Sequence, residues 1–220
     1  MITIVRRLLG VVLILIGIGA LVVGGWFARA LGTDGSATFT TTPPAGVPVV
    51  IDASTNARTD VPLTIEARAD SATPITVSIA SPSDAEAVLG ETRHVRVTGI
   101  DVREWELLTR TTGSADPIAP ATADLWRSQT TTEGQATIAG DLEAAPETMI
   151  ITAPEDTPLT SLTMTWTNAA WFYQALSLLF AGLLTALVGL ALVVRRGSAA
   201  DDDATSDPTP EMHSTSKVPA

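Results

Sequence analysis

The chain has 220 residues, a formal net charge of −11 and a pI of about 4.5, and it contains no cysteine. An acidic surface repels phosphate backbones, so the charge argues against a nucleic-acid partner. The lack of cysteine excludes disulfides, thiolate zinc sites and lipidated cysteine. Residues 28–170 carry eight arginines and nineteen acidic residues, although the mean hydropathy of the whole chain is +0.29. The apolar character therefore lies in the two ends of the chain.

The first apolar run covers residues 8–27, twenty residues without a charge. As a helix it would be about 30 Å long, the thickness of a hydrocarbon core, so we predict a membrane span. Gly10, Gly17 and Gly24 recur every seven residues on one face, where small residues let helices approach closely. A small-x-small sequence ending at Ala30 offers signal-peptidase cleavage as an alternative. The run is longer than a signal-peptide core, which favours a retained helix.

The middle of the chain is expected to form one extracytoplasmic domain, residues 28–170, that begins with an extended lead-in, 28–48. Alternation of apolar and polar residues then indicates short strands. They cover residues 61–67, 75–79, 93–98, 102–109, 137–139, 148–152 and 159–166. A loop is expected at 113–120. Seven or eight short strands predict a mainly β fold, an antiparallel sandwich with an immunoglobulin-like topology as one option.

One short helix is predicted at residues 82–89. Ser81 has the residue type of an N-cap, Pro82 suits the first helical position, and Asp84 is spaced for a capping box. Gly90 supplies the stop.

The second apolar run, residues 171–194, begins with an aromatic cluster of the kind that settles at the headgroup level. A pair of arginines starts at Arg6, before the first run, and another starts at Arg195, after the second. Since positive residues stay in the cytoplasm, we expect a two-span protein of the cell membrane with both termini inside. The tail, 195–220, is acidic and without hydrophobic period, so we expect it to be disordered.

Small residues also line the second run, at Ala181, Thr185 and Gly189. Such a stripe allows close packing of helices. The stripes of the two runs are expected to pack against each other, against a second copy in a homodimer, or against a membrane protein partner.

The search for chemistry finds no catalytic constellation. His94 is the one histidine of the central domain, and no nucleophile motif accompanies it. Asp101, Glu104 and Glu106 surround Trp105, which suits glycoside hydrolysis in principle, but a solvated strand face with a core tryptophan is the explanation we favour. We expect no enzyme, cofactor or metal site.

Exposed aromatic residues are the remaining candidates for recognition, because tryptophan is enriched at interface hot spots. We take Trp105, Trp126 and His94 as a candidate binding patch.

The segment between Thr76 and Arg127 resembles a group of actinobacterial envelope proteins. They have two membrane spans and a β-rich extracytoplasmic domain. The matching positions are Ile79, Ala80, Asp84, Leu89, His94, Val97, Pro120 and Trp126. The chain departs from the group at Ala85 and Val88, where valine and tyrosine are usual. The resemblance implies an architecture and a source, and no activity.

These observations lead to one expectation and two alternatives. The expectation is a non-enzymatic membrane protein that presents a β domain for interaction with a protein or an envelope component. The alternatives are an accessory subunit that docks on a larger membrane complex through its helices, and an envelope hydrolase.

Overall fold

The computed structural model describes residues 2–56, 61–70, 72–116, 125–140 and 147–194. The chain divides into two compact units, one of residues 1–21 with 180–220 and one of residues 22–179. The first holds parts of two helices, and the second holds the β domain with the remaining helix ends. The tail predicted to be disordered, and residues 117–120 of the predicted loop, lie outside the described residues.

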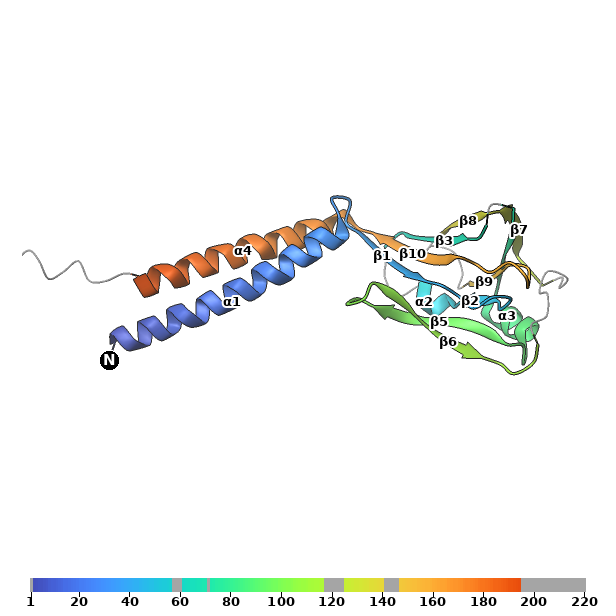
Figure 1. The fold of residues 1–220 in the computed structure, drawn as a ribbon, viewed down its shortest axis with the longest axis horizontal. Coiled ribbons are helices and arrows are strands. Elements are labelled where there is room, and N and C mark those ends of the chain that lie inside the picture. The colour runs from blue at the N-terminus through green and yellow to red at the C-terminus, as the bar shows by residue number, and fades with distance from the viewer. Residues whose placement is uncertain (1, 57–60, 71, 117–124, 141–146, 195–220) are drawn as a thin grey trace, which may run out of the picture. The chain divides into compact units, whose positions relative to one another are not determined.

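Two helices are long and apolar enough to cross a membrane (Figure 1). They are α1 (Ile2–Leu31) and α4 (Ala169–Val194), and their candidate spans have mean hydropathies of 2.7 and 2.5. Large apolar side chains stay exposed along both, with Leu8 65% and Leu184 64% accessible. The core helix of a soluble protein would bury such side chains. The two predicted runs are therefore candidate membrane-spanning helices.

Within the first unit the two helices lie in close contact because glycines face each other. A Cβ on Gly17 would lie 2.5 Å from the backbone N of Ala186, and one on Gly189 would lie 2.6 Å from the carbonyl oxygen of Gly10. A Cβ on Gly182 would lie 2.8 Å from the carbonyl oxygen of Gly17. Backbones this close gain dispersion energy that bulkier residues would prevent.

Only part of the small-residue stripe predicted on α4 lies on the face that contacts α1. Gly189 faces α1, whereas Ala181 is exposed and Thr185 donates a 2.8 Å hydrogen bond to the Ala181 carbonyl. In the second unit, a Cβ on Gly24 would lie 2.7 Å from the backbone N of Leu179. The predicted residues of α4 are four apart and drift away from the face that contacts α1. The glycines on that face, Gly182 and Gly189, are seven apart.

The β domain is built on one sheet of ten strands among the described residues (Figure 1). The strands are β1 (Ser36–Thr41), β2 (Val49–Ile51), β3 (Leu63–Arg68), β4 (Pro74–Ala80), β5 (His94–Asp101), β6 (Glu106–Thr112), β7 (Ser128–Glu133), β8 (Gln135–Gly140), β9 (Thr148–Thr152) and β10 (Ser161–Thr167). Their order in the sheet is β7-β4-β9-β2-β5-β6-β1-β10-β3-β8. A mainly β domain is thus confirmed.

The sheet is mixed, and this differs from the predicted antiparallel sandwich. β1 pairs with β6, and β2 with β5, in parallel, while the other pairs are antiparallel. An immunoglobulin-like sandwich is therefore not confirmed. Alternation shows which face of a strand is buried, but the direction of its neighbour depends on chain segments far apart in sequence.

The sheet curls until it is nearly a barrel. β7 and β8, the two edges, are consecutive strands joined at Gly134, whose φ is +72°. The backbone of Gly134 accepts from Ala69 N at 2.8 Å and donates to Thr73 O at 2.9 Å. On the other side, β1 and β6 share one register pair, Thr40 with Glu106. This sparse pairing leaves space between β1 and the β5–β6 hairpin.

Two apolar clusters form the core. β2 and β9 are buried on both faces, because Val49 and Ile151 point into the main cluster while Val50 and Ile150 point into a smaller one. The smaller cluster is covered by α3 (Pro82–Leu89), through Ala85 and Leu89 among others. Continuous apolar runs of this kind are expected where a strand is covered on both sides.

The predicted helix at 82–89 is confirmed, with Ser81 as its N-cap, but Asp84 bonds the Ser81 hydroxyl rather than the backbone N–H that a capping box uses. The Ser81 Oγ accepts from Asp84 N at 3.2 Å and donates to the Asp84 carboxylate at 2.7 Å. Gly90 ends the helix with φ +49°. A second short helix, α2 (Ala53–Asn56), was not predicted.

Candidate functional site: an apolar pocket

The second unit contains a pocket of about 420 Å³ between the helix ends and the sheet. Pockets that hold small ligands are typically about 300–1,000 Å³. Phe27 and Leu31 of α1, Phe39 of β1, Trp166 of β10 and Trp171 of α4 are among its walls, which are almost wholly apolar. No charged side chain of the described residues lines it. It therefore suits an apolar ligand rather than an ion or a charged substrate.

Aromatic contacts join four lining residues, Phe27, Trp105, Phe39 and Trp166, and the contact between the first two passes through Trp26. Phe27 and Trp26 meet edge to face with centroids 4.8 Å apart, and Trp26 contacts Trp105 at 5.8 Å. Trp105 stacks on Phe39 at 5.2 Å, and Phe39 meets Trp166 at 5.7 Å. Rings are stiff and bury large areas, so they hold the wall in one shape.

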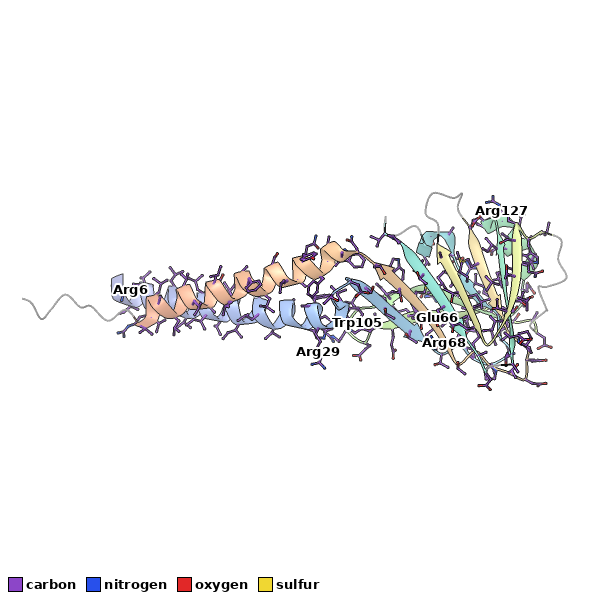
Figure 2. All side chains as sticks on the ribbon, turned by 90° about the horizontal axis from the view of Figure 1, so that it is seen from above. Arg6, Arg29, Glu66, Arg68, Trp105 and Arg127 are labelled. Carbon is purple, nitrogen blue, oxygen red and sulfur yellow. The ribbon has the colours of Figure 1, made fainter. Side chains whose placement is uncertain are left out.

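Trp105 reaches this wall through an unusual backbone conformation. It ends the turn of the β5–β6 hairpin with φ +57°, the one positive value at a non-glycine residue in the described part of the chain. Residues other than glycine and asparagine are strained at positive φ, and such strain is often found at functional sites. Figure 2 shows Trp105 beside the end of α1, near the start of β1. The turn was predicted as part of a strand, and this prediction was wrong at residues 102–105.

The indole N–H of Trp166 is an orphan donor. The residue is 6% exposed, and its Nε1 has no hydrogen-bond partner among the described residues. A buried donor without an acceptor is rare and calls for an explanation. The ring of Trp166 lines the pocket, but its Nε1 is enclosed and is not reached from the pocket.

The hairpin also places apolar side chains at the pocket mouth. Ile100 and Val102 line the pocket and are each 39% exposed, and Leu108 nearby is 48% exposed. Apolar side chains that remain exposed around a cavity are typical of ligand or membrane contacts.

The three residues of the predicted binding patch do not come together. Trp105 packs on the main core cluster and Trp126 on the smaller one under α3. His94 is 3% exposed, its Nδ1 lies 2.8 Å from Thr92 O, and it pairs with Thr112 at the end of the hairpin away from Trp105. Only Trp105 belongs to the pocket.

One of the acidic residues around Trp105, Asp101, has a structural role. The Asp101 carboxylate accepts from the backbone N–H groups of Arg103 at 2.8 Å and Glu104 at 3.3 Å, which closes the turn. The described residues contain no group of three or more histidine or acidic side chains that would hold a metal.

A second, more polar hollow of about 340 Å³ lies beside α3. Arg96, which lines this hollow, already forms ion pairs within the protein. Its Nη1 lies 3.1 Å from both carboxylate oxygens of Asp52, and its Nη2 lies 3.5 Å from a carboxylate oxygen of Glu86. With the cation already paired, this hollow offers less to a ligand than the apolar pocket does.

Comparison with protein-family models, with curated proteins and with solved structures finds no match for this chain. The resemblance to actinobacterial envelope proteins consequently stays a prediction from the motifs alone.

Sequence reasoning missed the pocket, although it singled out Trp105 and the aromatic start of the second span. The walls come from α1, β1, α2, β5, the turn after it, β10 and α4, which are far apart in sequence. The one available signal was the number of aromatic residues at the ends of the two spans.

Proposed function

We propose that the chain is a non-enzymatic, two-span membrane protein that presents its β domain outside the cell membrane to bind an envelope component. The apolar pocket is the observation that carries this proposal, because its chemistry is that of a binding site. Two candidate spanning helices support the membrane position. The cytoplasmic termini are supported by two pairs of arginines, one that begins at Arg6, near the start of the first span, and one that begins at Arg195, after the second.

Docking on a larger complex through the glycine face of α1 gains no support. Gly10 and Gly17 are covered by α4 of the same chain. A partner would have to displace that helix, and we therefore place the interaction in the β domain. An envelope hydrolase also lacks a supporting observation, since the carboxylate of Asp101 closes its own turn.

The orientation can be tested by cysteine labelling, because the natural chain has no cysteine. Thr131→Cys, exposed on β7, should react with a membrane-impermeant maleimide in intact cells. Ser198→Cys, in the tail, should react only after lysis. The opposite pattern would overturn the proposed topology.

Binding can be tested by purifying tagged full-length protein from its native membrane in mild detergent and identifying the co-purifying proteins, lipids and glycans by mass spectrometry. The pocket is filled by Ala37→Phe, since Ala37 is 7% exposed and lines it. Ala115→Phe, at an exposed position outside the pocket, is the matched control. A component lost with the first variant alone supports the proposal, and a co-purification pattern identical in all three proteins contradicts it.

A further inference from the structure

We infer that the apolar pocket holds one acyl chain of a membrane glycerolipid. The inference rests on the proposed function and names the envelope component.

The position of the pocket points to lipid. Its walls include Phe27 and Leu31 at the end of one candidate span and Trp171 and Leu178 at the start of the other. A pocket at the ends of membrane spans opens where acyl chains begin and headgroups end. Trp26 and Tyr173, 41% and 64% exposed, lie in the same helix ends and have the amphipathic character of an interfacial belt.

The shape and apolarity of the pocket favour a hydrocarbon chain. About 420 Å³ bounded by Phe39, Ile100, Trp105 and other apolar side chains gives a chain dispersion contacts on several sides. A peptide would bring backbone N–H and C=O groups that these walls leave without partners. A hydrocarbon chain brings none.

The absence of charge in the lining selects the kind of lipid. No acidic or basic side chain of the described residues lines the pocket. A free fatty acid would place a carboxylate there without a cation, which is unfavourable in apolar surroundings. The acyl chain of a glycerolipid carries no charge, and its headgroup can stay in water. A glycerolipid therefore fits the site better than a free acid.

The test uses two photoreactive lipids with the protein in nanodiscs. One is a phosphatidylglycerol with a diazirine on an acyl chain, and the other is a free fatty acid with the same diazirine chain. Mass spectrometry locates the crosslinks on the full-length protein. We expect crosslinks at pocket residues, with the phosphatidylglycerol favoured on the order of 10-fold, because the carboxylate of the free acid would find no cation there.

The variant Ala37→Phe fills the pocket, so it should reduce capture of the phosphatidylglycerol at pocket residues. Ala115→Phe, at an exposed position outside the pocket, is the matched control and should leave capture unchanged. Circular dichroism of both variants shows that the β domain is folded.

Equal capture of the phosphatidylglycerol and the fatty acid by the natural chain would overturn the choice of a glycerolipid. Crosslinks confined to the outer surfaces of the helices, or unchanged by Ala37→Phe, would overturn lipid occupancy. The proposed function would survive either result if another component is lost from the purified protein with Ala37→Phe. It would fall with the inference only if no component depends on the pocket.

Discussion

The rings of Trp105 and Phe39 stack with centroids 5.2 Å apart and planes 27° from parallel. Phe39 is 3% exposed and fixed in the core by β1, whereas Trp105 lies in a hairpin turn. The backbone of the same turn reaches β1 as well, since Thr40 N donates to Trp105 O at 3.2 Å. The hairpin is thus held to β1 at Trp105, at the side of the sheet where β1 and β6 share a single register pair.

Replacing Trp105 should separate the effect of its ring from the strain of its backbone. Trp105→Ala and Trp105→Gly both remove the ring, but only glycine adopts φ +57° without strain. We expect the glycine variant to be more stable than the alanine variant by about 1 kcal/mol, after allowance for the greater freedom of unfolded glycine. Chemical denaturation of the detergent-solubilised protein measures the difference. At Glu104, where φ is not positive, the alanine variant should be more stable than the glycine variant. A more stable glycine variant at both positions would contradict the strain at Trp105.

Gly35 should tolerate no side chain. Its φ is +69°, and a Cβ there would overlap the carbonyl oxygen of Asn168. The two residues are held together by a 3.1 Å hydrogen bond from Asn168 N to Gly35 O. We expect Gly35→Ala to lower the free energy of unfolding by about 3 kcal/mol or more, the sum of backbone strain and steric overlap. Gly90→Ala is the control, because Gly90 also has positive φ, +49°, but nothing within 4 Å of the added Cβ. It should cost only its backbone strain, about 1–3 kcal/mol, because its ψ of −123° lies outside the left-handed helical region. A loss as large as that of Gly35→Ala would contradict the overlap.

Elements with a strong local signal were predictable. The β9 range, Thr148–Thr152, and the α3 range, Pro82–Leu89, agree with the predicted residues, because an apolar run and a complete set of caps mark them. β3 and β10 lie within a few residues of their predictions, since alternation persists along most of their length.

Elements made by their neighbours were not predictable. β7 has the sequence SQTTTE without an apolar residue, and it is a strand because β4 offers it six register partners. β1 was expected only as part of a lead-in, since only Ala37 and Phe39 are buried on it. Its polar face is ordered instead by pairs with β10, such as Thr38 with Thr165 at 3.2 Å. The pocket depends on these non-local pairings and was missed for the same reason.

Arg96 should prove to be a structural cation. It joins β5 to Asp52 and Glu86, and its side chain is 27% exposed. Arg96→Lys keeps the charge and loses the planar group that contacts both carboxylate oxygens of Asp52, so we expect a loss of about 1 kcal/mol in the free energy of unfolding. Arg110→Lys, at the exposed cross-strand neighbour, should change it little. Denaturant titration measures the free energy of unfolding of both variants. Equal losses in the two variants would contradict a structural role for Arg96.

Asp34 should report the structure of the turn before β1. The Ser36 hydroxyl donates to its carboxylate at 2.7 Å, and this bond, followed by backbone hydrogen bonds, holds the pKa of Asp34 below 3.8. A lowered pKa in the folded state adds stability above pH 3.8, which is lost as the pH falls through the folded value. The effect should be small because Asp34 is exposed. Ser36→Ala should raise the pKa of Asp34 toward 3.8 in a carboxyl-detected NMR titration, and an unchanged value would contradict the role of the hydroxyl.

The glycines of α1 should differ in their tolerance of a large side chain according to the face they occupy. A Cβ on Gly17 would lie 2.5 Å from Ala186 N, whereas one on Gly19 would meet nothing within 4 Å. Gly17→Leu should therefore separate α1 from α4, while Gly19→Leu should be neutral or slightly stabilising, because leucine favours a helix more than glycine does. Unfolding of the detergent-solubilised variants in an SDS titration gives the readout, because separation of the helices removes their packing energy. The free energy of unfolding should fall with Gly17→Leu and should stay the same or rise slightly with Gly19→Leu. A fall in both variants would mean that leucine disturbs α1 by some route other than this contact, and no fall in either would show that the glycine face is not what holds the helices together.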